Sequence, residues 1–313
     1  MGSHLNDIAG GAVAMPDAGG PLSYTVAAAQ GPVRLRYFAP PEHLSAYFGS
    51  IYHFTVSADH YADATRADAP QLRFMLAGGG HYHFQDGLVM ATPDVCLLGP
   101  TMGATRFVLD RPARVLGISL LPAGWVTLHG GDASMMADRL CDLAQQDEGH
   151  ARLLDQLRAF DPDDADAMVA LCWDWLAQLV KPLRPASWDL LAAVDAWLMG
   201  EGSPRPEVLA QTTGLSPRQL ARLTNKYYGA PPKLLARKYR ALRCSARIAL
   251  DHESWQQLCE DGGFYDQSHF IREIKHFIGL TPHQLQTEPS AVAQLTLLRR
   301  SLGSDVAILN RLS

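Results

Sequence analysis

The chain has 313 residues, of which 47% are hydrophobic and 19% charged, and its formal net charge is −5. This composition excludes bulk disorder. The length favours about two domains, each large enough to bury a core without disulfides or structural metals. The mean charge gives no sign of a polyanionic partner, but an average can hide basic and acidic segments, so charge has to be counted by region.

Cysteine usage and the first residues of the chain bear on its compartment. The five cysteines are far apart and include no CxxC pair, which indicates a reducing compartment rather than a disulfide framework or a structural zinc site. No run approaches the roughly 20 apolar residues of a membrane-spanning helix. Residues 1–4 resemble a tag remnant, and the Gly/Ala-rich residues after them do not read as a signal peptide. We therefore expect residues 1–21 to be a tag and disordered N-terminus of a cytoplasmic protein without a membrane partner.

The segment 22–131 predicts a β-rich domain. Short runs typical of strands alternate with turn residues such as Gly78, Gly79 and Gly80. The runs are 34–38, 52–56, 72–77, 81–84 and 115–120. Many short strands at this spacing predict a sandwich or a small barrel.

The segment 132–184 predicts an acidic helical region followed by a linker. Apolar residues recur there at helical spacing, beginning with Met135, Met136, Leu140 and Leu143 and continuing from Leu153 to Leu179. Residues 132–174 hold 11 Asp or Glu and 3 Lys or Arg, and two prolines within 181–185 then interrupt any helix. Trp173 and Trp175 either pack inside the subunit, against the β-rich domain, or form the self-association surface of a homodimer.

The segment 187–287 contains an internal repeat. Leu220, Arg222, Tyr227, Gly229, Pro232 and Leu235 recur fifty positions later as Phe270, Arg272, Phe277, Gly279, Pro282 and Leu285. Each copy reads as a short helix, a turn at Gly214 or Gly263, and a second helix capped by Ser216 or Asp266. A helix of about 24 Å would separate the copies, which is compatible with two units reading successive major grooves about 34 Å apart. Residues 205–250 hold ten Lys or Arg and a single acid, so we expect an all-α tandem helix-turn-helix domain that binds double-stranded DNA.

The run 209–285, above all GLSPRQLARL and GFYDQSHFIREIKHFIGLTP, resembles the DNA-binding domain of AraC/XylS-type transcription regulators. Residues 35–131 resemble the sensor domain of a subgroup of these regulators. The resemblance implies an α+β chain with a barrel-like or sandwich-like, cupin-like sensor domain (22–131), a helical extension, the tandem domain (187–287) and a tail (288–313). It also implies a non-enzymatic transcription regulator, an activator that works with RNA polymerase and senses a small-molecule effector. The tail itself is apolar enough to pack against another part of the chain.

Base and phosphate contacts are expected on the exposed positions of the two recognition helices. Those of the first are Arg218, Gln219 and Arg222, and those of the second are Gln267, Ser268, His269 and Arg272. The phosphate candidates are Lys226, Lys233, Arg237, Lys238, Arg240 and Lys275. Arginine suits a bidentate contact to guanine and glutamine a contact to adenine, whereas a salt-bridged or solvated side chain is the alternative at each position. Five phosphate contacts would give a slope of log K against log salt of about −4 to −5.

His81 and His83 lie two residues apart on a predicted strand and therefore share one face. We interpret them as a polar lining of an effector pocket, with Trp125 and His129 as weaker pocket candidates that could equally be core. A cupin-like metal enzyme centred on the two histidines is the alternative, but no carboxylate or third histidine follows at a suitable spacing, so no metal or cofactor is expected. A further alternative is an effector-free regulator that a protein partner switches by docking on the acidic helices.

Overall fold

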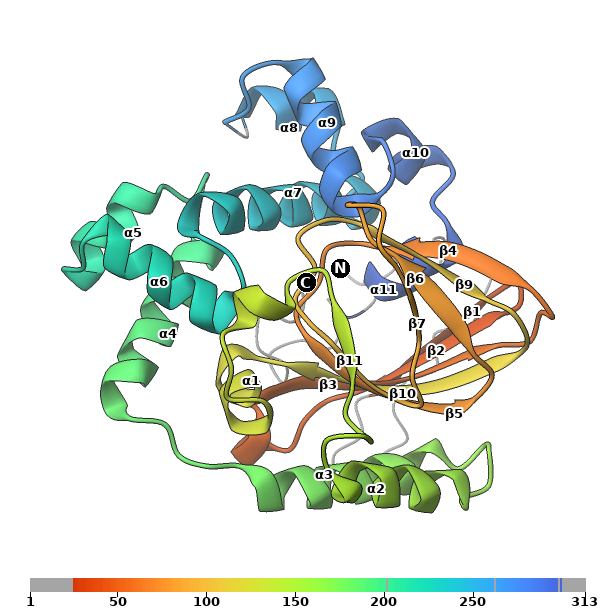
Figure 1. The fold of residues 1–313 in the computed structure, drawn as a ribbon. Coiled ribbons are helices and arrows are strands. Elements are labelled where there is room, and N and C mark those ends of the chain that lie inside the picture. Colours follow the sequence, from red (N-terminus) through yellow and green to blue (C-terminus); the bar gives the residue numbers. More distant parts are fainter. Residues whose placement is uncertain (1–24, 201, 262, 298, 300–313) are drawn as a thin grey trace.

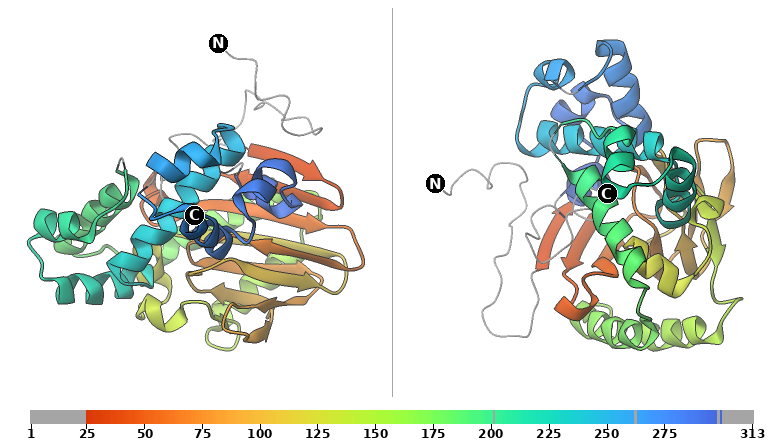
Figure 2. Two further views of the ribbon diagram at one scale, coloured as in Figure 1. Left: turned by 90° about the horizontal axis from the view of Figure 1, so that it is seen from above. Right: turned by 90° about the vertical axis from the view of Figure 1, so that its left-hand side faces the viewer.

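The computed structural model describes residues 25–200, 202–261, 263–297 and 299 (Figure 1). The expected tag and N-terminus at 1–21, and the tail residues after Arg299, lie outside these ranges. A β-sandwich with two helices beneath it forms one part of the molecule, and a helical part lies along one end and side of it (Figures 1 and 2). In the described ranges no helix is both long and apolar enough to cross a membrane.

Two antiparallel sheets make the sandwich. One has the order β1-β2-β3-β10-β5-β8-β11 and the other the order β4-β9-β6-β7. The strands are β1 (Thr25–Gln30), β2 (Val33–Phe38), β3 (Phe48–Val56), β4 (Tyr61–Thr65), β5 (Gln71–Ala77), β6 (Gly80–His83), β7 (Val89–Ala91), β8 (Val95–Leu98), β9 (Thr105–Leu109), β10 (Ala113–Leu120) and β11 (Leu140–Asp142). Each of the five predicted runs overlaps one of these strands, so the sandwich prediction is confirmed.

Alternation along β5 separates the two faces of the larger sheet. Leu72, Phe74 and Leu76 point to its outer face, whereas Arg73 and Met75 point between the sheets. The outer face is buried under α2 (Glu148–Arg158) and α3 (Ala165–Leu179). The inner face and the smaller sheet enclose a second apolar cluster and a cavity.

The tryptophans of α3 pack inside the subunit. The ring centroid of Trp173 lies 6.4 Å from that of Phe48, and that of Trp175 lies 6.4 Å from that of Phe74. Both partners belong to the larger sheet, so the intramolecular interpretation of these tryptophans is confirmed and they form no exposed self-association surface.

The helix expected over Met135, Met136, Leu140 and Leu143 is wrong. A short 3-10 helix (Ala133–Met136) is followed by β11, which pairs antiparallel with β8 so that Leu140 faces Leu98. An edge strand exposes a row of unsatisfied backbone groups, and β11 satisfies those of β8. Strand pairing therefore continues to Asp142, beyond residue 131, and residues 181–184 precede the helix that begins at Pro185.

The C-terminal helices reproduce the repeat. They are α4 (Pro185–Met199), α5 (Pro206–Thr213), α6 (Pro217–Tyr228), α7 (Pro232–Leu250), α8 (Trp255–Asp261), α9 (Gln267–Ile278) and α10 (Pro282–Thr287). The turns at Gly214 and Gly263 have φ of +66° and +71°, a backbone region that glycine adopts without strain. The tandem helix-turn-helix prediction is confirmed at the level of the fold.

The tail returns to the sandwich. Helix α11 (Ala291–Leu297) packs against β1, β2 and β4, and buries Val292, Leu295 and Leu297. The expectation that this apolar segment packs against another part of the chain is confirmed for these residues. Part of the sandwich surface is thus covered by residues that follow the helix-turn-helix repeat.

Candidate nucleic-acid interface

The first helix-turn-helix unit consists of α5 and α6. The Ser216 hydroxyl accepts a hydrogen bond from the Gln219 backbone N–H at 3.3 Å, and the Gln219 side chain accepts one from the Ser216 backbone N–H at 3.0 Å. This reciprocal cap stabilises the start of α6 but occupies the Gln219 side chain. Arg218 and Arg222 are exposed on the same helix, so they are the groups that α6 offers to a duplex.

The second unit consists of α8 and α9. Asp266 caps α9 by accepting a hydrogen bond from the His269 backbone N–H at 2.6 Å, as the sequence predicted. Gln267, Ser268 and Arg272 are exposed, whereas the His269 ring lies edge-on to Phe264 and accepts the Tyr265 backbone N–H at 3.3 Å. His269 therefore braces the turn.

Tyr265 is an exposed aromatic side chain that the sequence patterns did not single out. It precedes the cap of α9 and is 92% exposed. Its position between the partly buried Phe264 and the Asp266 cap was the available signal in the sequence.

Several basic side chains of α7 are engaged within the protein, which overturns three of the phosphate candidates. Arg237 forms a bidentate ion pair with Glu273, at 2.7 and 3.0 Å. Arg240 lies 4.2 Å from the Phe264 ring centroid and donates to the Gly263 carbonyl. Lys238 is 2% exposed, and its Nζ donates to the Asp68 carbonyl at 2.6 Å. The sequence gives Lys238 no visible partner because Asp68 lies 170 positions earlier in the chain.

The remaining phosphate candidates differ in position. Lys233 is exposed near the start of α7. Lys226 is half-buried, with its Nζ 5.5 Å from the Tyr227 ring centroid. Lys275, in the last turn of α9, lines a shallow cleft together with Asp63 of β4 and Arg106 of β9, which places it on the side of the sandwich. Lys233 therefore stays a phosphate candidate.

Both recognition helices meet the sandwich at their C-terminal ends. A Cβ on Gly229, which ends α6, would collide with Pro100, and one on Gly279, which ends α9, would lie 3.1 Å from the Cβ of Ala104. The Ala104 N–H donates to the His276 carbonyl at 2.8 Å, and the Ala67 N–H donates to the Phe277 carbonyl at 2.6 Å. Contact at these ends leaves the N-terminal ends, with their exposed polar residues, directed away from the sandwich (Figure 1).

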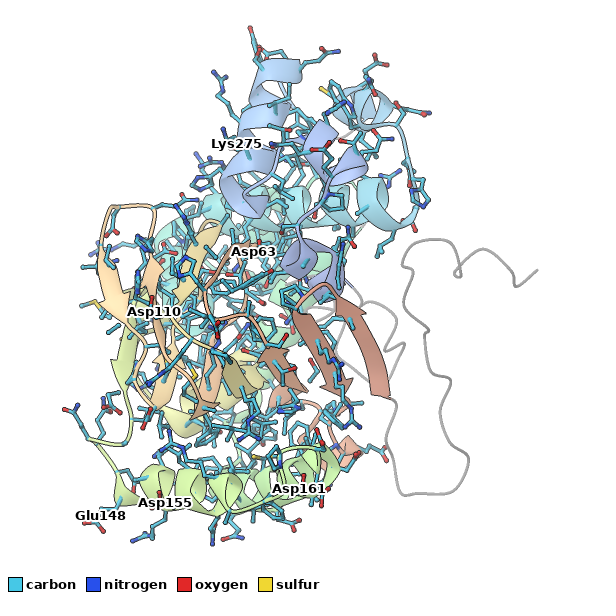
Figure 3. All side chains as sticks on the ribbon, turned by 90° about the vertical axis from the view of Figure 1, so that its right-hand side faces the viewer. Asp63, Asp110, Glu148, Asp155, Asp161 and Lys275 are labelled. Atoms are coloured by element: carbon cyan, nitrogen blue, oxygen red, sulfur yellow. The ribbon has the colours of Figure 1, made fainter. Side chains whose placement is uncertain are left out.

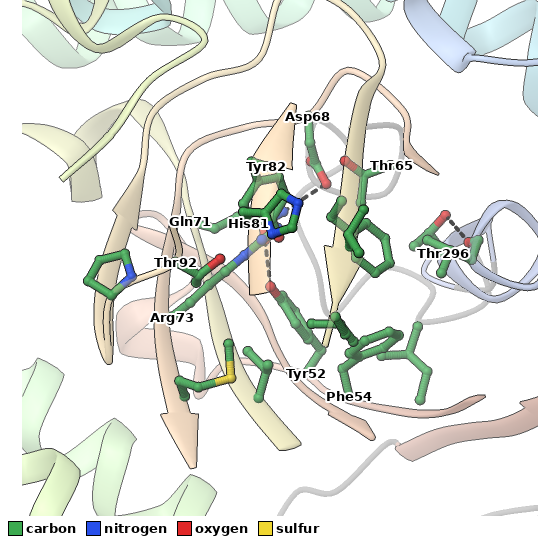
Figure 4. A pocket seen from close by; sticks show the side chains of 18 of the residues that line it. Tyr52, Phe54, Thr65, Asp68, Gln71, Arg73, His81, Tyr82, Thr92 and Thr296 are labelled. Atoms are coloured by element: carbon green, nitrogen blue, oxygen red, sulfur yellow. Dashed lines mark hydrogen bonds between the residues drawn. The ribbon is translucent and has the colours of Figure 1, made fainter. Parts of the chain in front are cut away.

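A cavity of about 80 Å³ lies between the two sheets. Its polar residues include Tyr52, Asp68, Arg73 and His81, and Figure 4 shows these four around it. Helix α11 contributes Val292 and Thr296 to the lining, and Arg299 follows it there. The cavity is thus built by both the β-rich domain and the tail of the chain.

Of the four residues expected in the pocket, His81 lines it. His83 lies beside His81 with ring centroids 4.9 Å apart, as expected for two positions on one strand face, but it is not in the lining. Trp125 is fully buried in the core between the larger sheet and its helices, and its indole N–H donates to the Gly131 carbonyl at 2.9 Å. His129 packs on Trp125. The assignment of Trp125 and His129 to the pocket is therefore wrong: Trp125 is a core residue, and His129 is partly buried against it.

The histidine pair has no metal-ligating companions in the described ranges. No group of three or more His, Cys, Asp or Glu side chains that could hold a metal ion occurs in those parts of the chain. The carboxylate paired with His81 is that of Asp110, whose Oδ2 lies 3.7 Å from Nδ1.

An arginine and carboxylate network crosses the polar end of the cavity. The Asp68 carboxylate accepts from Arg299 at 2.7 Å and from the Gln71 amide at 2.8 Å. Gln71 Oε1 in turn accepts from the Tyr52 hydroxyl at 2.6 Å and from Arg73 at 2.7 and 2.9 Å. Burial opposes ionisation of Asp68, but the neighbouring arginines outweigh it and lower its pKa.

Comparison with known proteins supports the repeat. A family model described as "Helix-turn-helix domain" matches residues 209–288. Invasion protein InvF of Salmonella typhi is 27% identical over 124 residues, covering 36% of this chain and 57% of the relative. The chain thus matches little more than half the length of that curated relative.

Solved structures with a similar arrangement are distant in sequence. A variant of ToxT from Vibrio cholerae, in its apo form, is 11% identical with a TM-score of 0.42, covering 82% of this chain and 97% of that one. The AraC-like transcriptional activator CuxR is 16% identical with a TM-score of 0.30, covering 69% of this chain and 81% of that one.

Proposed function

We propose, from the match of residues 209–288 to a helix-turn-helix family model and their resemblance to AraC-type domains, that the chain is a sequence-specific DNA-binding regulator whose β-rich domain senses a small molecule. The observation that carries the proposal is the paired, capped recognition helices, each of which exposes arginine and has glutamine or serine exposed at its start. Both helices abut the sandwich only at their C-terminal ends, which leaves these side chains accessible to a duplex.

We assign base contacts to Arg218 and Arg222 of α6 and to Gln267 and Arg272 of α9. Arginine can reach O6 and N7 of guanine, and glutamine can reach N6 and N7 of adenine. Ser268 and Lys233 are assigned to phosphates, which position the protein without reading sequence. Gln219 and His269 stabilise local structure in this assignment, and Lys275 is not assigned a contact.

The charge distribution favours the same orientation. Residues 205–286 hold 12 Lys or Arg and 7 Asp or Glu, whereas the whole chain has a net charge of −5. Figure 3 shows Glu148, Asp155 and Asp161 along α2 and its following turn, at the end of the molecule opposite Lys275. A duplex would be repelled from the acidic end and attracted to the basic one.

The proposal that the cavity holds an effector rests on its lining and its position. The walls are apolar apart from one polar end, which is the usual character of a small-molecule site. Asp68 at that end binds Lys238 of α7 through its carbonyl, so a ligand that moves Asp68 also acts on the helix that joins the two DNA-reading units. Activation, with RNA polymerase as partner, is proposed from the family likeness of residues 209–288.

A second candidate is an effector-free regulator that a basic protein partner switches by docking on the acidic helices. The exposed acids of α2 and of the turn after it favour this possibility (Figure 3). A thermal-shift screen with metabolites separates the two, because a ligand at a hundred times its Kd stabilises the native state by about 2.7 kcal/mol.

Mobility shifts with the full chain test DNA binding. Genome-wide mapping of bound DNA supplies the operator, and the same operator with its base pairs shuffled supplies the control. We expect the operator to be bound about a thousandfold or more tightly than the shuffled duplex at physiological salt. Equal affinity for both would contradict sequence-specific binding.

A further inference from the structure

The turn of the second helix-turn-helix unit is one residue longer than that of the first. Ser216 and Asp266, which cap the two recognition helices, correspond at an offset of fifty, whereas Leu215 and Phe264 before them correspond at forty-nine. Tyr265 is therefore the additional residue of the second turn, and 92% of its surface is exposed. A ring left in water contributes almost no burial to the folded state, so packing gives no reason for an aromatic residue at this position.

The backbone around Tyr265 is held on both sides. Before it, the Gly263 carbonyl accepts a hydrogen bond from Arg240 of α7 at 3.0 Å, and the Arg240 guanidinium lies 4.2 Å from the Phe264 ring centroid. After it, the Tyr265 N–H donates to His269 Nδ1 at 3.3 Å. The exposed ring therefore projects from a preorganised turn, which lowers the entropy cost of a contact made by that ring.

The place of this turn in the unit indicates which part of a duplex it would meet. In a helix-turn-helix unit the first helix crosses the sugar-phosphate backbone, and the first residues of the second helix contact base edges in the major groove. Tyr265 lies between these two helices, and Figure 1 shows α8 and the start of α9 projecting away from the sandwich. We therefore expect its side chain to meet the backbone at the edge of the groove rather than the bases on its floor.

The charge of the second unit points to a neutral donor at this place. Residues 255–269 hold three Asp or Glu and no Lys or Arg, whereas the corresponding residues 206–219 of the first unit hold one acid and Arg218. Phosphate contacts from α8, the turn and the first turn of α9 thus have to come from neutral groups. Ser268 is one such donor, and the Tyr265 hydroxyl, at the end of a longer side chain, is another.

We propose that Tyr265 is a backbone contact of the second unit: its hydroxyl donates to a phosphate oxygen, and its ring covers the adjoining deoxyribose. This inference rests on the proposed DNA-binding function and adds a residue that positions the second unit without reading sequence. The ring then loses to the sugar the water that it keeps in the free protein, which adds an apolar gain to the hydrogen bond.

Fluorescence anisotropy of the full chain with the operator and with its shuffled duplex tests the contact. Tyr265→Phe removes only the hydroxyl and should lower the affinity for both duplexes by about two- to tenfold, the range of one neutral hydrogen bond. Tyr265→Ala also removes the ring and should lower both affinities further. Wild-type affinity of both variants would overturn the proposal, and a loss confined to the operator would show that Tyr265 reads a base instead.

The salt dependence of the same titrations distinguishes a hydroxyl from a cation. A neutral donor displaces no counterion, so the slope of log K against log salt should be the same for Tyr265→Phe and the wild type, whereas Lys233→Ala should make it shallower by about 1. Met135→Ala is the control for loss of an exposed apolar side chain, since Met135 is 79% exposed outside the helix-turn-helix units. Its affinity should equal that of the wild type. A shallower slope for Tyr265→Phe would show that the residue acts through a neighbouring cation, against a direct contact.

Single methylphosphonate substitutions along the operator locate the phosphate. At one position, the neutral and weaker acceptor should lower the affinity of the wild type but cause no further loss for Tyr265→Phe, because the hydrogen bond is already absent there. If every position affects the wild type and Tyr265→Phe equally, the hydroxyl does not bind a phosphate.

Stability and wild-type binding separate the ways in which this inference can fail. The urea midpoints of both Tyr265 variants should match that of the wild type, since the ring is exposed, so that lost affinity is not unfolding. Specific binding by the wild type together with unchanged affinity of the variants would refute this contact alone. Equal affinity of the wild type for the operator and the shuffled duplex would refute the proposed function itself.

Discussion

The two helix-turn-helix units come from one repeated pattern, but each has a half-buried or buried carboxylate in a different environment. Next to the first, Asp195 of α4 accepts a hydrogen bond from the neutral Tyr228 hydroxyl at 2.6 Å. In the second, Glu273 is paired with Arg237. Burial raises the pKa of Asp195 to about 6, whereas Arg237 outweighs burial and lowers the pKa of Glu273. The repeat determines the turns and caps, and the neighbouring helices determine the electrostatics of each unit.

Truncation of the buried stripe gives the largest expected effect. Phe270 is 0% and Leu220 1% exposed at equivalent positions. Phe270→Ala should lower the free energy of unfolding by about 3–5 kcal/mol and Leu220→Ala by about 2–5 kcal/mol, because each leaves a cavity. Urea denaturation measures both, with Arg218→Ala as a surface control that should stay within about 0.5 kcal/mol. A loss below about 1 kcal/mol for either would show that its unit is not packed as described.

The pH dependence of stability should differ between the units. Because the pKa of Asp195 is raised on folding, the folded state holds its proton longer, and stability falls as pH rises between about 4 and 6, by about 2–3 kcal/mol at most. The pKa of Glu273 is lowered on folding. The stabilisation from its ionised carboxylate is therefore present at neutral pH and is lost as pH falls through and below the ordinary pKa of a glutamate.

Asp195→Asn isolates the first of these two effects. Denaturation curves at several pH values should show a smaller fall in stability between about pH 4 and 6 for the variant than for the wild type. Glu273→Gln serves as the comparison. It should remove the loss of stability on acidification, because it removes the titrating carboxylate, and it leaves Arg237 without its ion-pair partner. Parallel profiles for the wild type and Asp195→Asn would contradict the assignment.

Base readout should depend on both units. Arg218→Ala and Arg272→Ala should each cost about 1–3 kcal/mol of binding to the operator and relax specificity at one position, whereas Lys233→Ala should weaken all duplexes alike. Fluorescence anisotropy with operator and shuffled duplexes measures the difference. If Arg218→Ala lowers the affinity for both duplexes equally, Arg218 contacts only phosphate. The first unit then positions the protein on the duplex and does not read its sequence.

Removal of the caps gives the smallest effect. Ser216→Ala and Asp266→Ala should each lower stability by about 1 kcal/mol, since each leaves a backbone N–H at the start of a recognition helix unsatisfied. Gln219→Ala is the matched control for the first unit, because it removes only the reciprocal bond of the cap. A thermal or urea denaturation series measures all three. No loss from Asp266→Ala would show that water replaces this cap.

Local features were predictable from the sequence, and long-range ones were not. The caps at Ser216 and Asp266 and the turns at Gly214 and Gly263 follow from neighbouring residues, so the pattern alone locates them. The burial of Lys238 depends on Asp68, and the pairing of β11 depends on the edge of β8, neither of which a local pattern reveals. Met135 and Met136 belong to a short 3-10 helix, Leu140 to β11 and Leu143 to the segment after it, so their helical spacing arises from separate elements, and the helix over 135–143 was wrongly predicted.

The candidate effector site shows the same division. His81 could be placed in the pocket by strand alternation, but Trp125 and His129 could not be told from core. Arg73 was missed, although a single arginine between Leu72 and Phe74 in an otherwise apolar strand was a detectable signal. The contribution of Arg299 was beyond prediction because the sequence does not show that the tail returns to the sandwich.

The salt dependence of DNA binding by the full chain tests the central claim most directly. With Arg237, Lys238 and Arg240 engaged within the protein, about four cationic side chains remain for phosphates and bases, so log K against log salt should have a slope no steeper than about −3 to −4. That is shallower than the slope expected from the sequence. Binding that is absent, or insensitive to salt, would contradict the account of this chain as a DNA-binding regulator.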